Sequence, residues 1–298
     1  MSWEITFIKW LQSSASSFSN TIAEFVTNFG EQYILIVILA FIYFAYDKKV
    51  GEQIAYCTFI GVVSNNAIKG LVKASRPFIV APEILDDIPE AALESATGYS
   101  FPSGHTQNGS TFYSAIGFHF KKRWVWIVVI IAILLVGFSR IYLGVHFPKD
   151  VIVGAVLGFG GAWLGTFLYQ KWGQSYRSKL ILFLITAAVF LPFIFIFYRS
   201  NFNDIEIYRD FYTGYALMLG FIGAVAVENK WVDFTCNTTL KRRLIRFVLS
   251  LVVLIGVLLG LDKVFPEGYI LLDMLRYALV SFIGMGLYPF LFKPLHLD

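Results

Sequence analysis

The chain has 298 residues, of which 57% are hydrophobic and only 15% are charged, and its mean hydropathy is +0.66. A water-soluble domain of this length needs more polar surface, so the composition excludes an ordinary soluble enzyme and indicates a polytopic membrane protein. The formal net charge of +4 is too small to indicate a nucleic-acid-binding protein. The two cysteines, Cys57 and Cys236, lie in or beside different apolar segments and are expected to be free thiols.

Residues 1–29 form the first segment, which is only partly apolar. Trp3, Phe7 and Trp10 are mixed with Ser, Thr and Asn, and this pattern favours a helix that lies in the membrane interface. A disordered amino-terminal tail is the alternative. The segment lacks a basic region followed by an uninterrupted apolar run, so no cleaved signal peptide is expected.

Apolar segments long enough to span a membrane follow in chain order. They cover residues 30–46, 51–72, 104–120, 124–143, 150–170, 179–197, 210–227, 244–261 and 269–292. The sequence therefore predicts an all-α fold, a membrane helical bundle of about nine transmembrane helices.

Lysine and arginine are distributed unevenly between the two sides of these spans. They concentrate at alternate connections, around residues 48–49, 121–123, 171–179, 230–246 and 293. The positive-inside rule places these connections in the cytoplasm, with the amino terminus outside and the carboxyl terminus in the cytoplasm. The end of the second span, the start of the third, the end of the fourth and the start of the fifth then share the external face.

Polar and ionisable residues gather at those four ends. They occur in three fragments, K-G-L-V-K-A-S-R-P at 69–77, P-S-G-H at 102–105 and S-R-I-Y-L-G-V-H-F-P-K-D at 139–150. Ionisable groups in or beside a bilayer are costly, so they are functional candidates. Three cations, two histidines and one carboxylate indicate a phosphate-handling site, in which the cations bind oxygens, one histidine attacks phosphorus and the other protonates the leaving group.

The first fragment supplies two of the cations. Lys69 and Arg76 are seven residues apart, so they share one helix face if the second span stays helical through Ser75. Pro77 then discourages continuation of the helix. Arg76 alone could be a snorkelling residue at a helix end, but Lys69 lies well inside the span.

The second fragment opens the third span. Ser103 suits an N-cap, Gly104 lets a backbone amide approach an oxygen closely, and His105 falls in the first turn. Free backbone N–H groups at a helix start form an anion site. An ordinary capped turn with an interfacial histidine is the alternative.

The third fragment joins the fourth and fifth spans. The planar fork of Arg140 can bind two phosphate oxygens at once, which lysine cannot do. Pro148 suits the N1 position of the fifth span, with Asp150 in its first turn. From there Asp150 can hold one ring nitrogen of His146 and leave the other bare for attack.

Together the fragments resemble the signature K-x6-R-P, P-S-G-H, S-R-x5-H-x3-D of the type 2 phosphatidic acid phosphatase (PAP2) superfamily, with every signature position filled. The resemblance implies a PAP2-like catalytic transmembrane core over residues 30–178, between the interfacial segment 1–29 and additional helices of the same membrane domain over 179–298. It implies that His146 is the nucleophile and forms a phosphohistidine, and that His105 is the acid. It also implies a set of residues that bind the phosphoryl group: Lys69, Arg76, Ser103, Gly104, His105 and Arg140.

No metal and no other cofactor is expected, because the cations already supply the charge that a metal would supply. The acidic loop at 78–101 is expected to be a solvated external loop, with a lid over the site as the alternative. Asp273 and Arg276 are three residues apart in the last span and are expected to pair, although a transport or substrate role is the alternative.

The expected function is an integral-membrane, metal-independent phosphatase that acts on a phosphate monoester or diphosphate, with a membrane lipid phosphate favoured as substrate. Alternatives are a phosphotransferase that uses the same phosphohistidine, a phosphatase of soluble sugar phosphates, and a lipid transporter or scramblase with a degenerate site. The lipid bilayer is the expected surrounding, in a bacterial plasma membrane first and an endoplasmic reticulum membrane second. The sequence predicts no oligomeric state.

Overall fold

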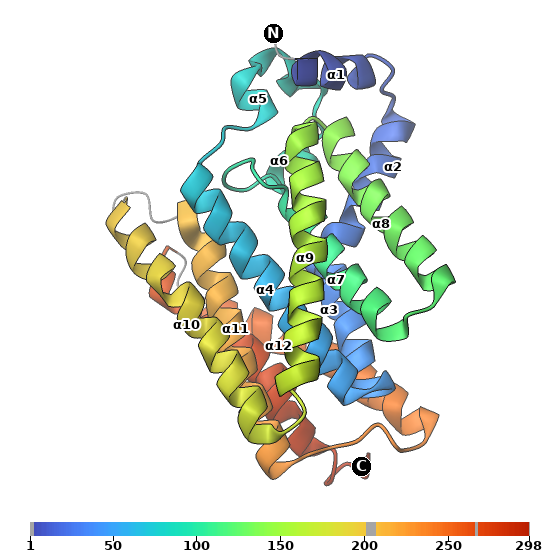
Figure 1. Ribbon diagram of the computed structural model, residues 1–298, viewed down its shortest axis with the longest axis vertical. Helices are drawn as coiled ribbons and strands as arrows, with labels where there is room; N and C mark the ends of the chain where they lie inside the picture. The colour runs from blue at the N-terminus through green and yellow to red at the C-terminus, as the bar shows by residue number, and fades with distance from the viewer. Residues whose placement is uncertain (1–2, 201–206, 266–267, 298) are drawn as a thin grey trace. The chain divides into compact units, whose positions relative to one another are not determined.

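A computed structural model describes residues 3–200, 207–265 and 268–297, and every regular element in these ranges is helical (Figure 1). The chain divides into two compact units. The first unit comprises residues 1–35 and 64–164, and the second comprises residues 36–63 and 165–298. Three helices continue from one unit into the other: α3 (Gln32–Phe41), α4 (Lys48–Val72) and α9 (Pro148–Trp172).

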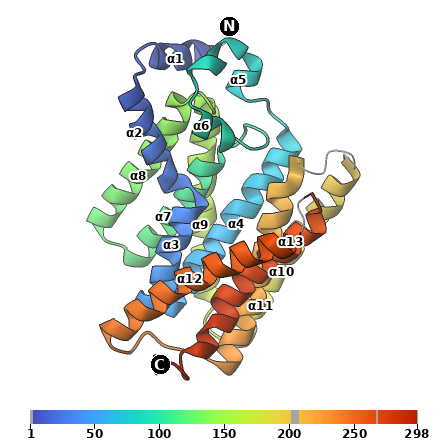
Figure 2. The same cartoon turned by 180° about the vertical axis from the view of Figure 1, so that it is seen from behind.

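The first unit holds the amino-terminal helices and the middle of the chain. Its remaining elements are α1 (Trp3–Gln12), α2 (Ser17–Thr27), η1 (Asn28–Gly30), α5 (Pro77–Val80), η3 (Pro82–Asp87), α6 (Glu90–Glu94), α7 (Gly104–Phe120) and α8 (Arg123–Tyr142). Figures 1 and 2 show α2 running alongside α8, and α1 beside α5 at the end that carries the amino terminus.

The amino-terminal segment is helical and is partly built into the protein. Ile5 and Ile8 of α1 are 2% and 0% exposed and belong to a core cluster with Ile84, Val145 and other residues of the connections around them. Burial of this apolar face stabilises α1 against the connections at 78–101 and 143–147. Trp3 and Trp10 remain exposed, as a helix in the membrane interface would leave them. A disordered tail is therefore wrong for the described part of this segment.

The second unit is built around α11. Its other elements are η2 (Ile42–Tyr46), α10 (Tyr176–Ser200), α11 (Arg209–Trp231), α12 (Leu240–Val264), α13 (Ile270–Phe282), η5 (Ile283–Leu287) and η6 (Tyr288–Leu291). A Cβ atom at Gly220 would lie 2.1 Å from the carbonyl oxygen of Ala278, so the absence of a side chain lets α11 and α13 approach closely.

Several buried charged side chains of the second unit form ion pairs. Lys48 donates to both carboxylate oxygens of Glu228 at 3.1 Å, and Lys179 binds Glu52. The predicted pair of Asp273 and Arg276 is confirmed, with Arg276 Nη2 2.8 Å from Asp273 Oδ1. Such pairing is needed where carboxylates lie away from water. Cys57 and Cys236, also in this unit, are free thiols as predicted.

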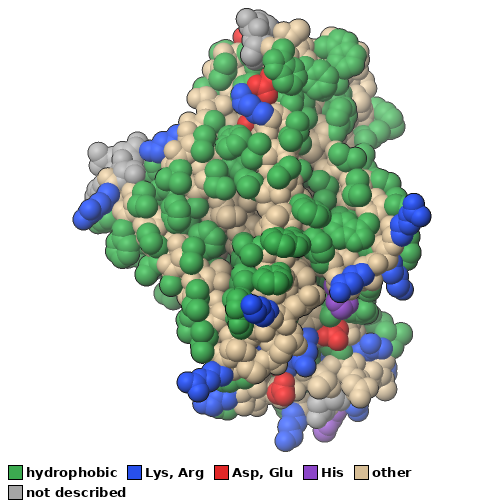
Figure 3. Space-filling model, viewed as in Figure 1, with side chains coloured by type: hydrophobic (Ala, Val, Ile, Leu, Met, Phe, Trp, Pro, Cys, Tyr) green, Lys and Arg blue, Asp and Glu red, His purple; other side chains and the backbone are tan. Residues whose placement is uncertain are grey.

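Helices occupy all the predicted spans, and most of them suit a membrane. Within the described ranges, six helices are long and apolar enough to cross, or seven if the bent pair Ser17–Gly30 and Gln32–Tyr46 forms one span. α4 and α7 do not meet this criterion, so the count of nine stays a prediction. Apolar side chains cover much of the visible face (Figure 3). In α8, six large apolar side chains are more than 50% exposed: Trp124, Ile127, Val128, Ile130, Ile131 and Leu134. Such a surface indicates an integral membrane protein.

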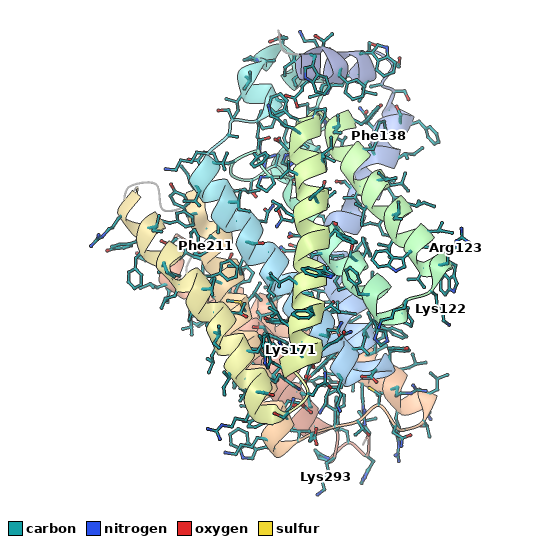
Figure 4. The ribbon with its side chains drawn as sticks, viewed as in Figure 1. Lys122, Arg123, Phe138, Lys171, Phe211 and Lys293 are labelled. Atoms are coloured by element: carbon teal, nitrogen blue, oxygen red, sulfur yellow. The ribbon has the colours of Figure 1, made fainter. Side chains whose placement is uncertain are left out.

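Basic residues mark one end of α8. Figure 4 shows Lys122 and Arg123 at its start and Phe138 towards its other end. The same end of the helix carries the cations that the positive-inside rule assigns to the cytoplasm. Arg140, near the opposite end of α8, is fully buried and has a different environment.

Candidate functional site

All eight predicted site residues lie in the first unit, at the ends of helices or, for His146, in the connection between α8 and α9. Lys69 is in the last turn of α4, Gly104 and His105 open α7, Arg140 is in the last turn of α8, and Asp150 is in the first turn of α9. Five of the side chains are at most 2% exposed: Arg76, Ser103, Arg140, His146 and Asp150. The structure therefore gathers these polar groups in a buried region, where each needs a partner.

Lys69 and Arg76 do not share one helix face, because the helix does not continue through Ser75 as that arrangement requires. α4 ends at Val72, and Lys73 adopts a left-handed backbone with φ of +54°. Arg76 has an extended backbone, because a residue before proline is driven out of the helical region, and Pro77 starts α5.

Arg76 instead ties three parts of the chain together. Its Nε donates to the carbonyl of Gly98 at 3.0 Å, and its Nη1 donates to the carbonyl of Val145 at 3.0 Å. Nη2 donates to the carbonyl of Thr97. Nη1 also lies 3.3 Å from Nε2 of His146. A guanidinium held by backbone carbonyls is fixed in place, so its charge is preorganised next to this histidine.

The start of α7 meets the end of α4. A Cβ atom at Gly104 would lie 3.7 Å from Lys69 Nζ, so the ammonium group is close to this backbone. Asn65 of α4 donates to Gln107 Oε1 at 2.9 Å and fixes the two helices together. By helix geometry the first amides of α7 lack intrahelical acceptors. Ammonium and amides together can bind an anion.

Ser103 is the N-cap of α7 as predicted, but its side chain does not cap the helix. Its hydroxyl lies 3.0 Å from Thr106 Oγ1, and its backbone N–H donates to the carbonyl of Asp150 at 3.0 Å. The amide of Ser103 is thus engaged in joining α7 to α9. The hydroxyl and the amides that follow it are the groups left for a phosphate oxygen.

His146 lies between two differently charged neighbours. Nε2 faces Arg76, whereas Nδ1 lies 3.6 Å from Asp150 Oδ2 and 3.4 Å from Ser100 Oγ. The carboxylate favours a proton on Nδ1, and Nε2 then carries the lone pair. The distance of 3.6 Å is longer than a hydrogen bond, so Asp150 acts on His146 mainly by charge and through Ser100.

Ser100 and a backbone amide hold Asp150. The Ser100 hydroxyl donates to Asp150 Oδ2 at 2.5 Å, and the N–H of Phe147 donates to the same oxygen at 3.1 Å. Both Ser100 and Asp150 are 0% exposed. This arrangement orients the carboxylate beside His146, as the predicted pairing requires.

Burial and three nearby cations favour the neutral form of His146. Desolvation is the largest effect, and the charges of Arg76, Lys69 and Arg140 add to it, so the pKa of His146 is held well below its usual value. A neutral imidazole has a free lone pair and can act as a nucleophile at neutral pH.

Arg140 is 0% exposed, and its fork is bound to hydroxyl groups. Nη1 donates to Thr27 Oγ1 at 3.0 Å, and both Nη atoms lie 3.3 Å from Ser95 Oγ. Arg140 Nε is buried and has no hydrogen-bond partner among the residues that the structure describes. Hydroxyl groups are weaker acceptors than phosphate oxygens, so an arriving phosphate can replace them on the fork.

His105 contacts a residue that the sequence analysis did not select. Its Nε2 lies 2.6 Å from Oε1 of Glu31, and the two side chains are 12% and 25% exposed.

Besides Glu31, the sequence analysis missed three further polar residues of the site, namely Thr27, Ser95 and Ser100. Glu31 was the one with a signal, because it is the only acidic residue in the predicted span 30–46. The hydroxyl residues lie in polar stretches where serine and threonine are common.

Within the described ranges, no three His, Cys, Asp or Glu side chains are grouped so that they could hold a metal ion. The site's positive charge comes from Lys69, Arg76 and Arg140. This arrangement can bind a phosphoryl group, offer it a neutral imidazole and stabilise charge on its oxygens.

Two family models match the chain. The model of the PAP2 superfamily matches residues 52–174, and a model described as the PAP2 superfamily phosphatase, transmembrane extension, matches residues 212–298. The first match contains all eight predicted site residues, and the second covers most of α11 to η6.

Curated relatives are similar over the same region. An undecaprenyl-diphosphatase of Sulfolobus acidocaldarius is 34% identical over 142 residues, which is 47% of this chain and 65% of the relative. The undecaprenyl-diphosphatase BcrC of Bacillus subtilis is 30% identical over 154 residues, or 49% of this chain and 75% of the relative. Among solved structures, LpxE of Aquifex aeolicus gives a TM-score of 0.47 at 22% identity, covering 55% of this chain and 95% of that one.

The chain thus spans just under two thirds of the Sulfolobus relative and three quarters of the Bacillus relative. The PAP2 match at residues 52–174 includes all three polar fragments, and BcrC of Bacillus subtilis is 30% identical over three quarters of its length. The chain belongs to the PAP2 superfamily.

Proposed function

We propose that this protein is a metal-independent membrane phosphatase that hydrolyses a lipid phosphate monoester or diphosphate through a phosphohistidine on His146. One observation carries the proposal: His146 presents Nε2 to the Arg76 guanidinium while Nδ1 faces Asp150 and Ser100. A phosphoryl group bound by Arg76 is therefore brought next to the nitrogen that has the lone pair.

The chemistry follows from the same contacts. Nε2 of His146 attacks phosphorus, the bond from phosphorus to the leaving oxygen breaks, and His105 gives that oxygen a proton. Lys69, Arg76, Arg140 and the first amides of α7 meet the charge on the phosphoryl oxygens. Water then attacks the phosphohistidine, the P–N bond breaks, and the proton from water passes to His105. Phosphate leaves and both histidines return to their starting states.

A lipid substrate is supported by the setting of the site. The residues lie at helix ends of a membrane protein, where a head group can reach the cations while its chain stays among lipid. Two relatives are named undecaprenyl-diphosphatases, so a polyprenyl diphosphate is the first substrate to test. The distribution of lysine and arginine supports a site on the extracytoplasmic face of a bacterial plasma membrane, with the amino terminus outside and the carboxyl terminus in the cytoplasm.

The test is phosphate release by the purified full chain in detergent or liposomes. Substrates are a polyprenyl diphosphate, a phosphatidate, a sphingoid-base phosphate and glucose 6-phosphate, each with and without EDTA. We expect release from a lipid substrate that EDTA does not affect and that His146→Ala abolishes. Turnover of glucose 6-phosphate alone would refute the lipid assignment. Inactivation by EDTA with recovery on adding magnesium would refute the mechanism.

A further inference from the structure

The contact between Glu31 and His105 is the least expected feature of the site. Glu31 lies between η1 and α3, at a break where the flanking helices bend by 50°. Its Oε1 is 2.6 Å from His105 Nε2. A carboxylate can only accept a hydrogen bond, so Nε2 carries a proton in this contact. The other ring nitrogen, Nδ1, is the one left for a reacting group.

The fold fixes this contact by close packing of the segment 27–31 against α7. A Cβ atom at Gly30 would lie 2.9 Å from the carbonyl oxygen of His105, so only glycine fits there. The Tyr113 hydroxyl donates to the carbonyl of Phe29 at 2.6 Å. His105 and Tyr113 are eight residues apart and therefore lie on the same face of α7. The segment that carries Glu31 is thus held against α7 at two points, Gly30 beside His105 and Phe29 beside Tyr113, and this places Glu31 next to His105.

The charges around His105 indicate how the Glu31 carboxylate acts on this histidine. Burial most strongly disfavours a positive charge on the ring, the charges of Arg140 and Lys69 add to this, and Glu31 opposes them. A general acid must carry its proton before the leaving group departs. Without a neighbouring negative charge, a buried histidine beside these two cations would lose that proton to water.

We propose that Glu31 is a positioning residue that holds His105 in the protonated, oriented form needed to protonate the leaving oxygen. This inference rests on the proposed phosphatase function. As the P–O bond breaks, the proton on Nδ1 of His105 passes to the departing oxygen, and the positively charged ring becomes neutral with Nε2–H still donated to Glu31. Attack of water on the phosphohistidine later returns a proton to Nδ1, so the cycle closes.

The experiment compares two substrates that differ in leaving group. Alkyl phosphates such as the lipid substrate need an acid, whereas p-nitrophenyl phosphate has a good leaving group and needs it little. Glu31→Gln keeps the size of the side chain and removes its charge. We expect it to lower kcat/KM for the alkyl substrate by about 10-fold or more, with a loss of less than about threefold on the aryl substrate. Glu24→Gln, which removes a charge from α2 outside the site, should leave both rates unchanged.

A double variant tests whether Glu31 acts through His105. If it does, adding Glu31→Gln to His105→Ala should cost nothing further on the alkyl substrate, because the group that Glu31 holds is already gone. Equal losses on both substrates for Glu31→Gln, or a further loss in the double variant, would overturn the inference. If His105→Ala itself lost both activities equally, the failure would lie in the acid role of His105 and thus in the proposed mechanism.

Discussion

Removal of the Ser100 hydroxyl is the perturbation whose size the structure fixes best. Ser100 Oγ donates to Asp150 Oδ2 at 2.5 Å, and both residues are 0% exposed, so water cannot replace the lost bond without rearrangement. A hydrogen bond to a charged group contributes about 1.5–3 kcal/mol. If Ser100→Ala loses that amount only in the transition state, the rate falls about 10- to 150-fold.

The loss should appear in kcat rather than in KM. Asp150 is needed most when His146 carries the phosphoryl group and its Nδ1 must stay protonated, whereas phosphate binding depends on the cations. The assay is steady-state phosphate release by Ser100→Ala in parallel with Ser110→Ala. Ser110 is also buried and donates one hydrogen bond, to the carbonyl of Ala155 at 2.8 Å, but it does not contact the site. Equal effects of the two substitutions, or an effect on KM alone, would refute the assignment of Ser100.

Three further results are expected. Burial and nearby cations keep the pKa of His146 well below 6.5, so protonation of this nucleophile should lower kcat only at pH values below 6.5. A fall in kcat on the acid side of the pH profile that is centred at or above pH 6.5 would contradict this. Vanadate should inhibit more strongly than phosphate, because it adopts the five-coordinate geometry of the transition state. Arg140→Lys keeps the charge but loses the two-pronged guanidinium, so it should weaken both vanadate inhibition and turnover. An unchanged inhibition constant and an unchanged kcat in this variant would remove Arg140 from the site. Topology can be tested with single cysteines introduced into the loops at 78–101 and 121–123 of a chain lacking Cys57 and Cys236. On intact cells, an impermeant thiol reagent should label only the cysteine at 78–101. Labelling only at 121–123 would show that the topology is inverted.

Most helices could be predicted from the sequence because a long apolar segment is the main signal of a membrane helix. The predicted span 124–143 corresponds to α8 (Arg123–Tyr142), within one residue at each end. The predicted span 51–72 also ends where α4 ends, at Val72, but the helix does not continue through Ser75, as a shared helix face for Lys69 and Arg76 would require. The left-handed backbone of Lys73 has no strong local signature, because lysine rarely adopts it.

The site was predicted as a set of residues but not as a set of contacts. The three fragments gave the ionisable groups, since a buried charge in an apolar chain stands out. Their partners come from elsewhere: Glu31 is 74 residues from His105, and Ser100 is 50 residues from Asp150. Contacts over such separations depend on how helices pack, which a single sequence does not encode in any local pattern.

The most direct test of the central claim is to trap the covalent intermediate. The purified chain is mixed with a substrate labelled with ³²P in the transferred phosphoryl group, quenched in alkali within the first turnover, and digested to locate the label. A phosphohistidine is stable in alkali and labile in acid. The account predicts label on the peptide containing His146, lost on acid treatment and absent from His146→Ala. Turnover by the wild-type chain without such label, or label that persists in His146→Ala, would contradict it.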